Sequence, residues 1–180
     1  MMVYVYLANG FEEVEALAPV DVLRRAGCEV KTVGVGGRLV TGSHKVTVMA
    51  DLEAENAPLD GVDMVVLPGG VPGTPNLEQS DAVQSAIEYC VMNDKYLAAI
   101  CAAPSILGHL GVLEGCEAIC YPGYEKDLKG AKISEQAVVR DGNVITGKGA
   151  GVAVDFGLKL AEVLCGEEKS QEVRMKMQCQ

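Results

Sequence analysis

The chain has 180 residues, of which 49% are hydrophobic, and a formal net charge of −10 at pH 7. This length and apolar content suit one globular domain with a substantial core, whereas the acidic balance disfavours nucleic acid, whose phosphates repel it. No apolar run approaches the roughly 18 residues of a membrane-spanning helix, and no basic N-terminal region indicates a signal peptide. We therefore expect a single cytoplasmic domain over residues 1–180 that binds neither nucleic acid nor membrane.

Strand-like and helix-like runs alternate along the chain. In chain order, the predicted elements are strand 2–8, helix 12–26, strand 29–35, strand 46–49, strand 63–67, helix 77–92, strand 96–100, helix 102–113, strands 118–120, 137–140 and 144–146, helix 151–165 and helix 167–177. Such alternation predicts a mostly parallel sheet with helices on both faces, an α/β sandwich of three layers. Ligands of such folds bind beyond the carboxyl ends of the strands, where loops 9–15 and 68–73 and the turn at Cys101 lie.

Cys101 follows the predicted strand 96–100 directly and precedes a helix-like run. A thiol at a sharp strand-to-helix turn is pushed out of the sheet, and the positive end of the helix dipole favours its thiolate, the form that attacks electrophiles. We therefore predict a nucleophilic or redox-active cysteine. The other six cysteines are interpreted as structural thiols, because the total is odd and no C-x-x-C motif occurs: Cys28, Cys90, Cys116, Cys120, Cys165 and Cys179. Reduced thiols suit a cytoplasmic protein.

Three carboxylates, Glu12, Glu13 and Glu15, open the first predicted helix. Acidic residues are favoured in a first helical turn, which is the ordinary structural explanation. Glu15 differs because its neighbours in the chain are apolar, so its side chain can face partly inward. A carboxyl group buried beside a thiol would have a raised pKa and could then donate a hydrogen bond to a thiolate or act as a general acid and base. We predict Glu15 as the partner of Cys101.

Glycines follow two of the predicted strands. Gly69 and Gly70 come after strand 63–67, and their N–H groups could form an oxyanion hole with the N–H of Ala102, with a simple tight turn as the alternative. The cluster at 147–151 lacks the spacing of a phosphate-binding loop and is interpreted as a turn into a helix that can also line the site.

Neither a metal site nor a cofactor is predicted. Cys116 and Cys120 form the only close cysteine pair, without a second pair to complete a zinc site. His44 and His109 do not stand at finger-like spacing from them and are interpreted as surface or packing residues.

The motifs together resemble the ThiJ/PfpI superfamily, in particular the branch of the parkinsonism-associated protein deglycase and its bacterial relatives. The matching segments are 10–15 (GFEEVE), 19–27 (PVDVLRRAG), 65–70 (VVLPGG), 98–104 (AAICAAP) and 149–151 (GAG). The resemblance implies a flavodoxin-like sandwich, a homodimer, a nucleophile at Cys101, a partner glutamate at Glu15 and backbone donors at Gly70 and Ala102. It also implies a substrate pocket, for which the candidates are Gly69, Tyr121, Pro122 and Gly149.

One departure from the pattern concerns the residue before Pro122. Some members of the superfamily carry a histidine near the cysteine, followed by proline, where this chain has Tyr121. A tyrosine hydroxyl can donate a hydrogen bond but is a poor base near pH 7, because a phenol ordinarily ionises only at about pH 10. A second departure is His44, which stands where some relatives carry an arginine at a dimer contact.

Three functions are consistent with these residues. The resemblance implies a cofactor-independent glyoxalase or deglycase, which acts on methylglyoxal, related 2-oxoaldehydes or glycated protein. The alternative is a redox-sensing protective chaperone in which Cys101 is oxidised to sulfinate and Glu15 donates to it. A cysteine peptidase or amidase is the third, and it lacks a histidine placed by sequence to activate the thiol.

Overall fold

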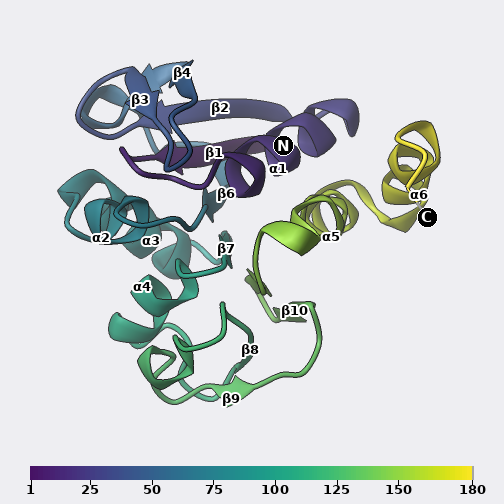
Figure 1. The fold of residues 1–180 in the computed structure, drawn as a ribbon. Helices are drawn as coiled ribbons and strands as arrows, with labels where there is room; N and C mark the ends of the chain where they lie inside the picture. The colour runs from purple at the N-terminus through teal and green to yellow at the C-terminus, as the bar shows by residue number, and fades with distance from the viewer. Residues whose placement is uncertain (180) are drawn as a thin grey trace.

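In the computed structural model, which describes residues 1–179, a seven-stranded sheet separates two layers of helices (Figure 1). The strand order is β10-β11-β7-β6-β1-β2-β5, and every neighbouring pair is parallel except β10 with β11. The strands of this sheet are β1 (Met2–Leu7), β2 (Glu29–Gly34), β5 (Leu52–Glu53), β6 (Val62–Leu67), β7 (Tyr96–Ile100), β10 (Val138–Asp141) and β11 (Val144–Gly147). The predicted fold class, an α/β sandwich with a mostly parallel sheet, is confirmed.

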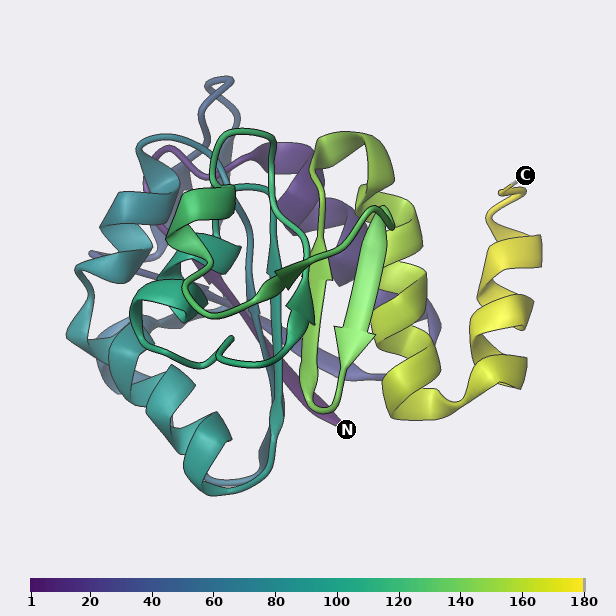
Figure 2. The same cartoon turned by 90° about the horizontal axis from the view of Figure 1, so that it is seen from below.

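The helices divide between the two faces of the sheet, as the view in Figure 2 also shows. They are α1 (Glu13–Arg25), α2 (Gly73–Glu78), α3 (Asp81–Met92), α4 (Pro104–His109), α5 (Ala153–Cys165) and α6 (Glu167–Lys176). Smaller elements are the hairpin of β3 (Leu39–Thr41) and β4 (Thr47–Met49), the pair β8 (Glu117–Ala118) and β9 (Lys132–Ile133), and the 3₁₀ turns η1 (Ala54–Asn56), η2 (Glu125–Asp127) and η3 (Ala150–Val152). None of the helices described is long and apolar enough to cross a bilayer.

The central strand β1 shows why helices are needed on both faces. Successive side chains of a strand point to opposite faces of a sheet. Val3, Val5 and Leu7 pack into the core formed with α1 and α5, whereas Tyr4 and Tyr6 pack into the core formed with α3 and α4. All five are buried, so an uncovered face would expose large apolar side chains to water.

The side of the sheet on which the chain adds strands changes at β1. It leaves β1 through α1 to β2 on one side, and it returns to β6 on the other side before α3 leads on to β7. Because α1 and α3 cover opposite faces, the connections that follow β1 and β6 separate above the carboxyl edge of the sheet. Crevices at such a reversal are the usual ligand sites of open α/β sheets.

Two predicted helices differ in the structure. The helix predicted at 77–92 is two helices, because Ser80 has an extended backbone (φ −84°, ψ 117°) and its side chain accepts from the N–H of Val83, capping α3. The helix predicted at 102–113 contains only α4, Pro104–His109, since Gly111 has a φ of +73° that ends it. Strands β3, β5 and β9 were not predicted.

Candidate functional site

Cys101 occupies the turn between β7 and α4 with a left-handed backbone. Its φ of 66° costs a non-glycine residue about 1–2 kcal/mol. The turn is held on both sides, because the Cys101 N–H donates to the Gly147 carbonyl at 2.9 Å and the Cys101 carbonyl accepts from the Tyr121 N–H at 2.8 Å. The strained backbone presents a partly exposed thiol at the carboxyl edge of the sheet, as the predicted strand-to-helix turn requires.

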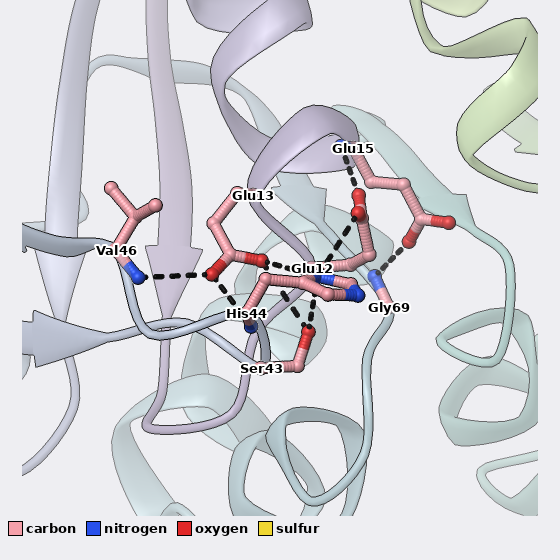
Figure 3. A network of polar contacts seen from close by, with 7 residues as sticks. All are labelled: Glu12, Glu13, Glu15, Ser43, His44, Val46 and Gly69. Carbon is pink, nitrogen blue, oxygen red and sulfur yellow. Dashed lines mark hydrogen bonds and ion pairs between the residues drawn. The ribbon is translucent and has the colours of Figure 1, made fainter.

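Glu15 reaches this thiol from the first turn of α1. The glutamate is buried, its Oε2 accepts from the Gly69 N–H at 3.0 Å, and its carboxyl group shares a hydrogen bond with the Cys101 thiol. The Glu15 N–H donates to Glu12 Oε2 at 2.7 Å, which caps the helix. Figure 3 shows the Glu15 carboxyl directed to Gly69 and away from Glu13. The predicted pairing of Glu15 with Cys101 is therefore present in the geometry.

Burial controls the ionisation of Glu15. Desolvation raises the pKa of this carboxyl from 4.5 to about 7, and the negative charge of Glu12 adds to the rise. Hydrogen bonds from Cys101, Gly69 and Ala150 oppose it. A group with this pKa exists in both protonation states near pH 7, as a general acid and base requires.

Burial and the neighbouring Glu15 both oppose ionisation of the Cys101 thiol. Burial raises its pKa to about 12, and the negative charge and hydrogen bond of Glu15 contribute to the rise. This direction is opposite to the predicted stabilisation of a thiolate by a helix dipole, since α4 begins three residues later at Pro104 and has only six residues. Since the two groups interact directly, the ionisation of one depends on the protonation of the other.

Backbone donors surround the sulfur. The N–H groups of Gly70 and Ala102 both face the Cys101 thiol and lower its pKa against the larger effect of burial. Gly69 has no room for a side chain, because a Cβ there would lie 2.6 Å from Glu15 Oε2 and 2.7 Å from Cys101 Cβ. The structure thus brings the N–H groups of Gly70 and Ala102 to the sulfur, and the absence of a side chain at Gly69 leaves room for Glu15 beside Cys101.

Loops from the other half of the chain complete the surroundings. A Cβ on Gly149 would lie 3.4 Å from Tyr121 Cδ2 and 3.9 Å from Glu15 Oε1, so these residues border the carboxyl group. Tyr121 is 52% exposed and lies at the rim, and Pro122, the next residue, is also exposed. The backbone of Ala150 hydrogen-bonds Glu15, a contact that was not predicted from the sequence. The glycines on either side of Ala150 are the sequence feature that could have indicated it.

Glu13 has a role that the sequence did not indicate. Its buried carboxylate accepts from the N–H of His44 at 2.8 Å, from His44 Nδ1 at 3.0 Å, from the N–H of Val46 at 3.3 Å and from Ser43 Oγ at 3.4 Å (Figure 3). Burial alone would raise the pKa of Glu13, but these hydrogen bonds outweigh it and lower the pKa. Glu13 therefore fastens the turn between β3 and β4 to the start of α1.

Glu12, Glu13 and His44 bring one ligand atom each within 4.8 Å of one another, which is a candidate arrangement for a metal ion. The Glu13 oxygens already accept four hydrogen bonds from the turn, and Glu12 caps α1. Both carboxylates thus have structural partners, and we assign this cluster to fastening the turn.

Comparison with known proteins identifies the family. The model of the DJ-1/PfpI family matches residues 1–163, and the chain belongs to that family. Protein dj-1beta of Drosophila melanogaster is 40% identical over 172 residues, which cover 94% of this chain and 92% of the relative. The structure of oxidized Toxoplasma gondii DJ-1 superposes with a TM-score of 0.94 at 31% identity, covering 98% of this chain and 97% of that one. A glutathione-independent glyoxalase of Caenorhabditis elegans, DJR-1.2, is 29% identical over 163 residues, which cover 90% of this chain and 87% of the relative.

Proposed function

We propose that the protein is a cysteine-dependent, cofactor-independent glyoxalase that converts methylglyoxal or a related 2-oxoaldehyde to the 2-hydroxy acid. The observation that carries the proposal is a buried carboxyl group with a pKa of about 7 hydrogen-bonded to a thiol. Both groups are needed for a reaction that adds sulfur to an aldehyde and then moves a proton between adjacent carbons. The name of the nematode relative supports the same class of reaction.

The first step forms a carbon–sulfur bond. Glu15 as carboxylate accepts the thiol proton while the Cys101 sulfur attacks the aldehyde carbon. The carbonyl oxygen gains the electron pair, receives hydrogen bonds from the Gly70 and Ala102 N–H groups, and is then protonated to give a hemithioacetal.

The next steps return the thiol. Glu15 takes the proton from the former aldehyde carbon and delivers it to the neighbouring carbon, while the hydroxyl proton of the hemithioacetal passes to the neighbouring ketone oxygen, so the hemithioacetal becomes a thioester of the hydroxy acid. Water adds to the thioester carbonyl, the carbon–sulfur bond breaks, and the proton returns to Cys101. The sum is one 2-oxoaldehyde and one water converted to one hydroxy acid.

Lactate production from methylglyoxal without glutathione tests the proposal. The wild type should form lactate, and Cys101→Ser and Glu15→Gln should each abolish detectable turnover. Cys116→Ser, which removes a partly buried thiol outside the site, is the matched control and should retain the wild-type rate. Absence of lactate with the wild type, or an equal rate with Cys101→Ser, would refute the proposal.

The histidines argue against a cysteine peptidase or amidase. The chain has two histidines. His44 Nδ1 is bound to Glu13 at 3.0 Å, and His109 Nδ1 is bound to Glu78 Oε1 at 2.5 Å. Tyr121 occupies the rim where a histidine base would stand in some relatives, so thiol activation falls to Glu15.

A second candidate is redox sensing through Cys101. Glu15 is partly protonated near pH 7 and can donate to an oxygen of a Cys101 sulfinate, which two equivalents of peroxide produce from the thiol with release of two waters. The related Toxoplasma structure is described as oxidized. Intact-mass analysis after mild peroxide should show two added oxygens confined to Cys101, and oxygens spread over the other cysteines would oppose this role.

Family resemblance supports further features of the proposal. We extend the substrates to glycation adducts on protein, and we propose a single domain that assembles as a cytoplasmic homodimer. Val14 and Leu17 are exposed on α1 and offer apolar surface for such an assembly. Sedimentation velocity of the purified protein distinguishes the dimer from a monomer.

A further inference from the structure

We propose that Cys28 and Cys165 form a second redox site, which peroxide closes to a disulfide independently of Cys101. The two sulfurs are 3.4 Å apart although the residues are 137 positions apart in the chain. Both are free thiols in the structure. Sequence reasoning interpreted each of them as a structural cysteine, and the contact between them is visible only once the chain is folded.

The ends of two packed helices bring the sulfurs together. Helices α1 and α5 lie side by side on the same face of the sheet (Figure 1). Cys28 follows the end of α1 after Gly27, and its N–H donates to the Leu23 carbonyl at 3.0 Å, which fixes its position. Cys165 is the last residue of α5 and precedes Gly166, whose φ is 88°. The sulfurs are already in contact, so bond formation draws together two side chains that the fold holds beside each other.

The two thiols differ in their access to an oxidant. Cys28 is 7% exposed, and burial together with the neighbouring Cys165 sulfur raises its pKa to about 12. Cys165 is partly exposed. Peroxide therefore reaches Cys165 first, and Cys28 is held as the thiol that resolves the product.

The reaction consumes one peroxide for each disulfide. Peroxide transfers an oxygen to the Cys165 thiol, which becomes a sulfenic acid, and water is released. The Cys28 sulfur then attacks the Cys165 sulfur, the sulfur–oxygen bond breaks, and the departing hydroxyl leaves as a second water with the Cys28 proton. Two thiols are oxidised by two electrons in total, and a small-molecule thiol such as glutathione reverses the change by exchange.

This pair lies at the opposite edge of the sheet from Cys101. Cys28 directly precedes the first residue of β2, whereas Cys101 directly follows the last residue of β7. Strands β2, β1, β6 and β7 run parallel, so the amino end of β2 and the carboxyl end of β7 lie on opposite edges. The proposal therefore stands apart from the proposed glyoxalase chemistry.

A disulfide here would join the ends of two helices that pack on one core. The link would close a loop that spans most of the chain, and it would restrict the unfolded chain more than the folded one. The physical consequence is a protein whose resistance to unfolding increases when peroxide is present.

Peptide mapping of the full-length chain tests the site directly. Reduced wild type and Cys101→Ser are exposed to stoichiometric hydrogen peroxide, remaining thiols are blocked with N-ethylmaleimide, and non-reducing digests are analysed by mass spectrometry. We expect a peptide that joins Cys28 to Cys165 in both proteins, two hydrogens lighter than the sum of its parts and cleaved by a reductant. The unfolding temperature of the oxidised protein should exceed that of the reduced protein.

Three results would overturn the proposal. They are a Cys165 that ends as sulfinic acid, a Cys165 that is linked to Cys179 instead, and a Cys28–Cys165 pair that stays reduced while Cys101 is oxidised. The variants Cys28→Ser and Cys165→Ser should each lose the linked peptide and the rise in unfolding temperature, and Cys179→Ser should keep both. Peptide mapping of the wild type tests the proposal even if one of these variants fails to fold.

Discussion

The protonation of Glu15 links the chemistry of the site to the stability of the protein. The folded-state pKa of this carboxyl is raised from 4.5 to about 7. A group with a raised pKa contributes stability below its unfolded value, and that contribution is lost as the pH rises through the folded value. A rise in pH from 4.5 to 7 therefore destabilises the fold through a carboxyl group that the proposed reaction needs in its ionised form.

Glu15→Gln should stabilise the protein while it removes turnover. Glutamine keeps an oxygen for the Gly69 N–H and has no charge to bury. A shift from 4.5 to about 7 corresponds to roughly 3 kcal/mol, so the free energy of unfolding at pH 8 should rise by up to that amount. Urea unfolding at pH 4 and pH 8 measures it. Glu88→Gln, an exposed position on α3, should change neither value, and a gain equally large at pH 4 would contradict the account.

Gly69→Ala should reduce turnover at the candidate site although it changes no charge. The added Cβ would clash with Glu15 Oε2 at 2.6 Å and with Cys101 Cβ at 2.7 Å, so the pair must separate. We expect lactate formation to fall by about 100-fold or more, since misplacement of a reacting group by an ångström has effects of that size. Gly151→Ala is the control, because a Cβ there meets nothing within 4 Å. Equal loss in both variants would mean that the clash is not responsible.

The hairpin β3–β4 depends on α1 through one side chain. Glu13 fastens its turn, and Gly42 leaves the necessary space, because a Cβ at Gly42 would lie 2.3 Å from the Glu13 carboxylate. The lowered pKa of Glu13 means that the carboxylate stabilises the fold above its unfolded value of 4.5 and that this stability is lost as the pH falls through the folded value.

Glu13→Gln should therefore destabilise the hairpin and also reduce the loss of stability at acidic pH. Replacing one acceptor oxygen by an amide that faces donors leaves buried N–H groups unsatisfied, which costs about 1–3 kcal/mol of unfolding free energy at pH 7. Below pH 4.5 the difference from wild type should shrink. Thermal unfolding across this pH range measures both, and amide hydrogen exchange of 42–46 should accelerate. His44→Ala, whose side chain is 73% exposed, should have a smaller effect; the reverse order would be evidence against Glu13 as the anchor.

Secondary structure was predictable where the signal was local. Strands β1, β2, β6 and β7 and helices α1 and α5 followed from periodicity and from the glycines that end several of them. The break between α2 and α3 at Ser80 was not predicted, because the apolar pattern continues through it and only the capping hydrogen bond of Ser80 marks the start of α3. The strands β3 and β5 are short and depend on their partner strands β4 and β2, and Glu13 holds the turn that follows β3, so sequence spacing alone did not indicate them.

The whole molecule assembles its candidate site from distant parts of one sheet edge. Glu15 follows β1, Gly69 follows β6, Cys101 follows β7, and Gly149 and Ala150 follow β11. Motifs and resemblance could predict that Cys101 and Glu15 pair. They could not predict the ionisation, because the pKa values depend on burial by loops that meet only in the folded protein. For the same reason the contact of Cys28 with Cys165 had no sequence signal.

The pH dependence of Cys101 alkylation tests the central claim, that Glu15 receives the thiol proton. Iodoacetamide is added at a series of pH values, and the rate at Cys101 is followed by peptide mass analysis. The wild-type rate should rise through a midpoint near pH 7, where Glu15 ionises. Glu15→Gln should lose this midpoint and keep only the rise that comes with ionisation of its own buried thiol, at a lower pH than in the wild type because the charge of Glu15 is gone. The same profile in both proteins would contradict the account.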